Sequence, residues 1–155
     1  MIEIHSLSLD EFKQNLENLI KIYLNAYKDL KAYAYTHRRD VKSYLKWLYK
    51  SDPESFFIAI SDKKIIGFVA GTRFWWDKTY GEIGEVHEIV VDKPYQGKGI
   101  GKMLMERILF FLQKYHDTIG LWVGEKNQRA IAFYQHLGFN IVGQVGRWLR
   151  MIKEK

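Results

Sequence analysis

Three glycines and two lysines within six consecutive residues are the part of this sequence best suited to chemistry. Gly97, Gly99 and Gly101 alternate with Lys98, Ile100 and Lys102. Because glycine has no Cβ, the main chain can approach a ligand closely at these positions. If a helix begins here, its unpaired N–H groups and the positive end of its dipole attract phosphate. We therefore predict that this segment binds a polyphosphate, with the two lysines adding positive charge.

The residues on either side indicate that the glycines join a strand to a helix. Upstream, the apolar, β-branched residues Val86, Ile89, Val90 and Val91 are followed by Asp92-Lys93-Pro94, which predicts a strand closed by a turn. Downstream, apolar residues recur every three to four positions from Ile100 to Tyr115, which predicts a helix.

Two common phosphate loops do not fit this spacing. A Walker loop has four residues between its glycines and a Ser or Thr after its lysine, whereas three residues separate Gly97 from Gly101 and Met103 follows Lys102. A dinucleotide fingerprint would place a third glycine at position 102. A plain strand-to-helix turn is the alternative interpretation, although such connections seldom combine three glycines with flanking lysines.

The elements that must position this segment follow from hydrophobic periodicity and turn residues. A capping box at Ser8 and Glu11 predicts a helix to about Tyr27, and Asp40 is the expected N-cap of a second helix that ends before Asp52-Pro53. The remaining predicted helices are residues 100–115 and 127–137, and the predicted strands are 1–6, 56–60, 65–73, 82–91, 118–123, 140–144 and 147–152. The order β-α-α-β-β-β-α-β-α-β-β predicts an α/β fold, with a mixed central sheet and helices on both faces, in a single domain spanning residues 1–155.

Composition limits the classes of function. The chain has 155 residues, a net charge of +6 and no cysteine, which excludes disulfides and thiolate chemistry and favours anionic partners. The five histidines show no metal-binding spacing, so we expect no metal site. The first residues resemble no signal peptide, and no run of about 18 apolar residues occurs, so we expect a cytoplasmic protein with no membrane span.

Two blocks of the sequence match a known family. The first is Q-x-x-G-x-G at residues 96–101, preceded by V-D-x-P-Y; the second is GLWVGEKNQRAIAFYQHLGF at residues 120–139, which contains A-x-x-F-Y-x-x-x-G-F. Together they resemble the acetyl-CoA-binding motifs of the GNAT superfamily of N-acetyltransferases and cover about half of the chain. The resemblance implies an acyltransferase that uses acetyl-CoA as cosubstrate and acetylates a primary amine by direct transfer.

The resemblance also implies a set of coenzyme-binding residues. A main-chain N–H near Ile89, at a bulge in the strand, is expected to polarise the thioester carbonyl, and the strand edge is expected to pair with the pantetheine arm. Arg129 is either a phosphate partner or a solvated helix-surface charge. The full set is Ile89, Val90, Val91, Gln96, Gly97, Lys98, Gly99, Ile100, Gly101, Lys102, Asn127 and Arg129.

Three residues are candidates for proton transfer. Tyr134 lies seven residues after Asn127, where the family places the tyrosine that protonates the leaving thiolate; core packing is the alternative role. Glu85 corresponds to the acidic residue that some members use to accept the amine proton. His87 lies two residues on, and alternation places both side chains on one face and Glu88 on the other unless a bulge intervenes. A lone strand histidine is, alternatively, structural.

The sequence indicates less about the acceptor of the acetyl group than about the coenzyme. Tyr33 and Tyr35 lie in the segment between the first two helices, which lines the acceptor site in the family, although packing between those helices would also explain them. One departure from pattern is Trp122, where ribosomal-protein alanine acetyltransferases have glutamate. We expect a protein or peptide amine as acceptor, and a monomer or homodimer. The alternatives are another acyl-CoA, a small-molecule amine, a non-catalytic acyl-CoA-binding module and, less favoured, nucleic-acid binding.

Overall fold

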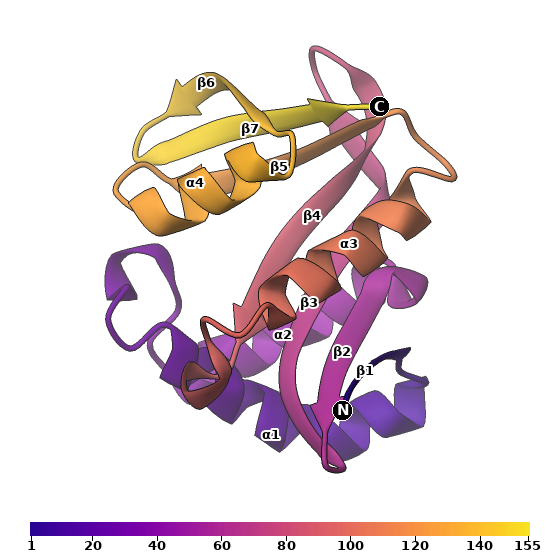
Figure 1. Ribbon diagram of the computed structural model, residues 1–155, viewed down its shortest axis with the longest axis vertical. Coiled ribbons are helices and arrows are strands. Elements are labelled where there is room, and N and C mark those ends of the chain that lie inside the picture. Colours follow the sequence, from indigo (N-terminus) through magenta and orange to yellow (C-terminus); the bar gives the residue numbers. More distant parts are fainter.

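One seven-stranded mixed sheet organises the chain (Figure 1). The computed structural model describes all residues, 1–155. The strands are β1 (Ile2–Ser6), β2 (Phe56–Ser61), β3 (Lys64–Asp77), β4 (Gly81–Val91), β5 (Thr118–Gly124), β6 (Asn140–Val145) and β7 (Trp148–Glu154). The helices are α1 (Leu9–Ala26), α2 (Arg38–Ser51), α3 (Ile100–Leu112) and α4 (Gln128–His136), with 3₁₀ turns η1 (Lys31–Tyr33), η2 (Pro53–Ser55) and η3 (Lys93–Tyr95).

The predicted order of helices and strands is confirmed, although several boundaries shift; α3, for example, ends at Leu112 and not at Tyr115. Helix α2 begins at Arg38 with His37 as its N-cap, so Asp40 lies within the first turn instead of capping it. Strand β3 continues four residues past its predicted end at Arg73, because its last residue, Asp77, still pairs with Gly81 of β4. No helix combines the length and the apolar character needed to cross a bilayer.

Alternation along the central strands divides the core into two layers. In β2, Phe56 and Ile58 pack with α1 and α2, whereas Phe57 and Ala59 pack with α3. All four side chains are at most 3% exposed. Side chains two apart share a face of a strand, so helices cover both faces of the sheet, as the pattern predicted.

The strand order is β1-β2-β3-β4-β5-β7-β6, and the pairing of β4 with β5 decides where the sheet opens. This parallel pair forms only two residue matches, Gly84 with Ile119 and Glu85 with Gly120. Beyond them the two strands diverge. On its other edge, β4 shifts register against β3, because Ala70 of β3 pairs with Glu88 whereas Gly71, the next residue of β3, pairs with Val86. His87 is therefore the extra residue of a β-bulge.

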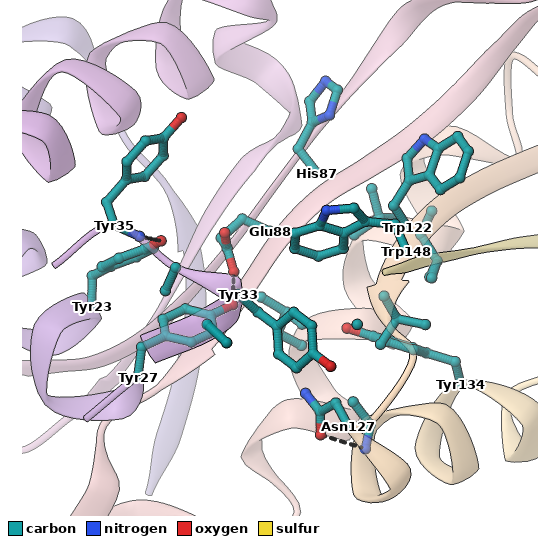
Figure 2. Close-up of a pocket in the computed structure, with 18 of the residues that line it drawn as sticks. Tyr23, Tyr27, Tyr33, Tyr35, His87, Glu88, Trp122, Asn127, Tyr134 and Trp148 are labelled. Carbon is teal, nitrogen blue, oxygen red and sulfur yellow. Dashed lines mark hydrogen bonds between the residues drawn. The ribbon is translucent and has the colours of Figure 1, made fainter. Parts of the chain in front are cut away.

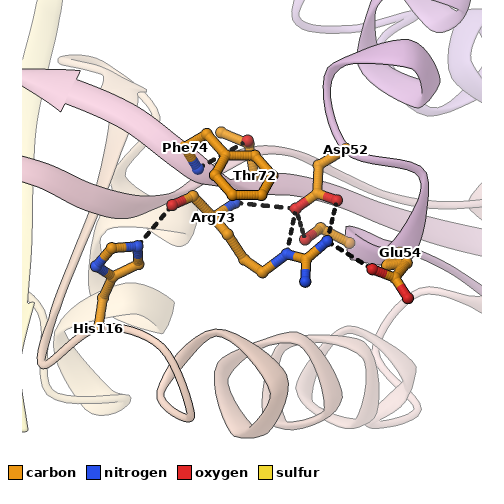
Figure 3. A network of polar contacts seen from close by, with 7 residues as sticks. Asp52, Glu54, Thr72, Arg73, Phe74 and His116 are labelled. Atoms are coloured by element: carbon orange, nitrogen blue, oxygen red, sulfur yellow. Dashed lines mark hydrogen bonds and ion pairs between the residues drawn. The ribbon is translucent and has the colours of Figure 1, made fainter.

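A polar network joins η2 to the end of β3 (Figure 3). Asp52, which is 2% exposed, accepts hydrogen bonds from the Ser55 hydroxyl at 2.6 Å, from the Arg73 main-chain N–H at 3.0 Å and from the Arg73 guanidinium at 2.9 and 3.0 Å. Glu54 adds an exposed second carboxylate to Arg73. Although burial acts in the opposite direction, hydrogen bonds from Arg73 and Ser55 hold the pKa of Asp52 below its usual range.

Because the Asp52 pKa is depressed by folding, its stabilisation is complete above the unfolded-state pKa and is lost as pH falls through the folded-state pKa. We predict that Asp52→Asn lowers the free energy of unfolding by about 3 kcal/mol at pH 7, since the ion pair between the buried Asp52 carboxylate and the largely buried Arg73 guanidinium is lost. In denaturant titrations, this difference should shrink as pH falls below 4. Glu54→Gln, at the exposed end of the same network, should change stability by less than about 1 kcal/mol; an equal loss in both variants would contradict this account.

Candidate active site

An inner cavity of about 390 Å³ opens where β4 and β5 diverge (Figure 2). Its walls come from β4, β5, β7, α1, α2, α4 and the segment between α1 and α2, and six tyrosines and two tryptophans are among its nineteen lining residues. Glu88 is the single acidic residue among them. The lining residues are Tyr23, Tyr27, Ala32, Tyr33, Ala34, Tyr35, Tyr44, Val86, His87, Glu88, Ile89, Leu121, Trp122, Val123, Gly124, Asn127, Ala130, Tyr134 and Trp148.

The bulge turns Glu88 into this cavity. Its carboxylate accepts hydrogen bonds from the Tyr27 and Tyr44 hydroxyls, the second at 2.8 Å. Burial raises the pKa of Glu88 to about 7, against the lowering effect of the two phenols and of the Ile89 main-chain N–H. A carboxyl group with this pKa is divided between its two protonation states near neutral pH, so it is suited to exchange a proton.

Glu85 does not share a cluster with His87, contrary to the prediction. It is 1% exposed and pairs through both carboxylate oxygens with Arg150, at 2.7 and 2.9 Å. Arg150 also binds Asp77 at 3.0 Å, and Glu85 lines neither the inner cavity nor the groove described below. The prediction assumed strict alternation of side chains along β4. The bulge at His87 interrupts that alternation, so His87 does not share a face with Glu85 and the residues after it change sides.

His87 does line the inner cavity, but it points away from Glu88 (Figure 2). Its ring lies between Trp47 and Trp75, with centroid distances of 4.9 and 4.8 Å, and its Nε2 atom is buried without a hydrogen-bond partner. Burial, together with the nearby Arg150 charge, lowers the pKa of His87 to about 4. The imidazole is therefore neutral at physiological pH and only weakly basic.

A second depression, the loop groove, has a volume of about 580 Å³ and runs along the glycine-rich segment. Gly97 and Gly99 adopt φ angles of +78° and +83°, which side-chain-bearing residues rarely adopt. No main-chain acceptor is found for the N–H groups of residues 97–102, and the first helical bond runs from Met103 N–H to the Gly99 carbonyl. Free N–H groups at the start of a helix, such as these at α3, are suited to bind an anion.

The predicted phosphate-binding residues gather around this groove. Gln96 is held by a hydrogen bond from its side chain to the Val91 carbonyl, at 2.9 Å. Arg129 approaches Gly97, since a Cβ built on that glycine would lie 3.9 Å from the guanidinium. Lys98 lies over the Tyr95 ring and is absent from the groove lining. The lining residues are Ala26, Tyr27, Leu30, Ile89, Val90, Val91, Tyr95, Gln96, Gly97, Gly99, Ile100, Gly101, Lys102, Asn127, Arg129, Ala130, Phe133 and Tyr134.

The inner cavity and the loop groove meet at five shared residues, Tyr27, Ile89, Asn127, Ala130 and Tyr134. The Asn127 side chain accepts a hydrogen bond from the Ala130 N–H at 3.3 Å and thereby caps α4. The Tyr134 hydroxyl has no hydrogen-bond partner and points toward the middle of the cavity, where Glu88 reaches in from another side (Figure 2). Burial, with the Glu88 charge, raises the pKa of Tyr134, so the phenol keeps its proton.

The segment between α1 and α2 brings both predicted acceptor residues to the inner cavity. The Tyr33 hydroxyl accepts a hydrogen bond from the Lys126 N–H at 3.0 Å, and its ring packs edge-on against Trp148 at 5.4 Å. Tyr35 donates its main-chain N–H to the Tyr23 hydroxyl at 3.2 Å, and its ring is 48% exposed. Tyr33 therefore ties this segment to the carboxy-terminal half of the chain, whereas Tyr35 remains open.

Sequence reasoning missed four residues of this site: Glu88, Tyr27, Tyr44 and Trp148. Tyr27 and Tyr44 lie in predicted helices without any signal that marks them as site residues, and Glu88 was placed on the wrong face of its strand. The family resemblance implied a bulge near Ile89, and its position at His87, before Glu88, decides which face Glu88 occupies. The two tyrosines could have been found only from the carboxylate that they bind.

Comparison with known proteins gives one consistent result. The family model described as Acetyltransferase (GNAT) family matches residues 16–139. The chain is 39% identical over 124 residues to an uncharacterized N-acetyltransferase of Archaeoglobus fulgidus, covering 79% of this chain and 84% of that protein. It is 36% identical over 143 residues to an uncharacterized N-acetyltransferase of Methanocaldococcus jannaschii, covering 91% of this chain but 63% of the relative's length.

Among solved structures, the PH1933 protein from Pyrococcus horikoshii OT3 superposes with a TM-score of 0.92 at 43% identity, over 100% of this chain and 99% of that one. A family match over most of the chain, and the same fold at this identity, agree with the two motifs and with the opening between β4 and β5. The chain therefore belongs to the acetyltransferase (GNAT) family.

Proposed function

We propose that this protein transfers the acetyl group of acetyl-CoA directly to a primary amine, with Glu88 as the base and Tyr134 as the acid. The observation that carries the proposal is that the inner cavity and the loop groove meet where Glu88 and Tyr134 both face the junction. An amine entering the inner cavity would there meet the thioester of a coenzyme bound along the groove.

Main-chain groups make most of the proposed contacts with the coenzyme. The free N–H groups of residues 97–102 face the pyrophosphate, while Lys102 and Arg129 supply positive charge beside them. The pantetheine arm follows Ile89, Val90 and Val91, on the edge of β4 that β5 no longer pairs with. An added strand-like chain satisfies such an edge. Asn127 then lies beside the arm, close to the thioester.

Transfer requires two proton movements. Glu88 accepts one proton from the neutral amine as its nitrogen attacks the thioester carbon and forms the C–N bond. As the C–S bond breaks, Tyr134 gives its proton to the departing sulfur, and its raised pKa keeps that proton in place until sulfur carries charge. We retain a protein or peptide amine as the favoured acceptor, with Tyr33 and Tyr35 among its contacts. Glu85 and His87 shape the site without carrying the proton.

Tyr134→Phe removes the acid and keeps the ring. We expect kcat to fall about 100-fold, because general-acid catalysis contributes at least that much, while the Kd for coenzyme A changes less than about twofold. Coenzyme release measured with a panel of amines, and calorimetry for binding, separate the two effects. Tyr115→Phe, at an exposed tyrosine far from either cavity, is the control. Normal turnover in Tyr134→Phe would remove this residue from the mechanism.

Glu88 should impose a pH dependence on turnover. Since burial raises its pKa to about 7, the active carboxylate is lost as pH falls below 7. The fraction of free amine also changes with pH, so the informative quantity is the ratio of kcat/KM for wild type to that for Glu88→Gln. This ratio should rise as pH increases through 7 and then level off. The exposed Glu106→Gln variant should track wild type throughout, and a ratio that stays flat would rule out Glu88 as the base.

The glycine loop offers a matched pair of substitutions. Gly99→Ala and Gly146→Ala both force alanine into a positive φ, at +83° and +59°, and neither added Cβ meets a protein atom within 4 Å. Each should cost about 1–2 kcal/mol of stability. We predict that only Gly99→Ala weakens coenzyme A binding, by tenfold or more in Kd, because only its Cβ lies beside the free N–H groups. Equal affinities in the two variants would place the phosphates elsewhere.

A further inference from the structure

A third hollow, the side pocket, adjoins the inner cavity and has a volume of about 530 Å³. It lies along α2 and is lined by Tyr35, Asp40, Ser43, Tyr44 and Trp47. Two of these residues, Tyr35 and Tyr44, also line the inner cavity. The two spaces therefore adjoin at these tyrosines, and a slender molecule that starts at Glu88 would have to pass them to reach the side pocket.

The charges in this path have one sign. Asp40 is the single charged residue that lines the side pocket, and Glu88 is the single acidic one that lines the inner cavity, where His87 is neutral. The chain as a whole carries a net charge of +6, but no lysine or arginine lines either space. Local charge thus favours a cation in a protein whose overall charge does not.

The walls of the side pocket also suit a cation. The Tyr44 ring packs against Tyr35, at a centroid distance of 5.1 Å, and is nearly parallel to Trp47 at 6.2 Å. Tyr35 and Trp47 are 48% and 46% exposed, so their faces remain available to a ligand. Aromatic faces grouped around a carboxylate attract ammonium groups through the ring quadrupole as well as through charge.

The Tyr44 side chain sets the separation of the two carboxylates. Asp40 and Tyr44 lie one turn apart on the same face of α2, which places their Cβ atoms about 5–6 Å from each other. The far end of Tyr44 donates its hydroxyl hydrogen bond to Glu88, at 2.8 Å. Asp40 and Glu88 therefore lie near opposite ends of one tyrosine, a distance that a short alkyl chain can span.

The opposite wall of the inner cavity is closed. Tyr33 accepts its hydrogen bond from Lys126, and Arg147 donates a hydrogen bond to the Ala32 carbonyl at 3.1 Å. A Cβ on Gly124 would lie 2.5 Å from the Tyr33 ring, so the contact between the two halves of the chain is tight there. An acceptor bound at Glu88 consequently extends toward the side pocket and not toward β5 and β7.

We propose that the acceptor amine carries a second ammonium group, and that this group binds at Asp40 between Tyr35, Tyr44 and Trp47 while the reactive nitrogen lies at Glu88. The proposal rests on the acetyl transfer described above and specifies its substrate class. The second ammonium group belongs either to a linear diamine or polyamine, or to a lysine side chain close to the amino terminus of a peptide. Both present the same chemistry to Asp40.

Paired acceptors test this assignment. In the first arm, kcat/KM for butylamine is compared with kcat/KM for α,ω-diamines from diaminopropane to diaminooctane. In the second arm, kcat/KM for a short peptide with leucine at position two is compared with that for the same peptide with lysine at position two. We expect one dication to exceed its matched monocation by about tenfold or more, since a charge-assisted contact is worth at least that factor. The diamine and peptide arms identify the source of the second ammonium group.

Two variants assign the effect to Asp40. Asp40→Asn should remove the preference through KM and leave the monocation rate within about twofold. Asp10→Asn is the matched control, because Asp10 also lies in the first turn of a helix and lines none of these cavities. No preference for any dication in the wild type, or an equal loss for both members of a pair in Asp40→Asn, would overturn the proposal.

A binding measurement keeps this test separate from the test of catalysis. Calorimetry titrates the preferred dication into the protein saturated with coenzyme A, and the affinity should fall about tenfold in Asp40→Asn and stay unchanged in Asp10→Asn. If no amine is acetylated but the dication still binds through Asp40, acetyl transfer fails while the subsite stands. If amines are acetylated and the dication binds no better than butylamine, the subsite fails alone.

Discussion

The short parallel contact between β4 and β5 is the constraint on which the rest of this structure depends. Two residue pairs join the strands at Gly84 and Glu85, and beyond them the edge of β4 has no neighbour. An unpaired strand edge inside a protein leaves main-chain groups without partners. In this chain that edge forms the floor of both cavities, so the same divergence that leaves the groups free also creates the space in which a ligand can satisfy them.

Buried charge fixes the point at which the strands separate. Arg150 of β7 reaches Glu85 of β4 and Asp77 of β3, and its guanidinium lies 4.9 Å from the centre of the Trp122 ring. A Cβ on Gly120 would lie 2.4 Å from the same guanidinium, so β5 can approach only because it has glycine there. Removing one partner of such a buried group costs more than the pair contributes. The ion pair therefore holds the three strands together at the end of the opening, and Arg150 lies against Trp122, which lines the inner cavity.

Glu85 and Glu88 lie on the same strand but have different partners. Glu88 has no cationic partner, and two phenols with raised pKa values supply its hydrogen bonds. The carboxyl group therefore keeps a pKa near neutrality, whereas an arginine at this position would have held it ionised. Glu85, three residues earlier in the strand, pairs with Arg150 through both carboxylate oxygens and lines neither cavity, although burial raises its pKa as well. The neighbours of each group, and not its residue type, decide which glutamate is available.

Sequence alone determined the order of elements, the two-sided sheet and the glycine loop, because these depend on local periodicity and on residues with special backbone freedom. The spacing of residues 96–101 and of 130–139 was also sufficient to indicate the family. The identity of the carboxylate that faces the cavity depended instead on one extra residue in β4, and a bulge at His87 leaves no mark on the pattern of apolar and polar positions. The contacts of Glu88 with Tyr27 and Tyr44 are also long-range. Tyr27 of α1 lies 61 residues before Glu88 in the sequence, and Tyr44 of α2 lies 44 residues before it. Such contacts arise only when the two helices pack on the sheet, so the tertiary structure alone decided which residues form the site.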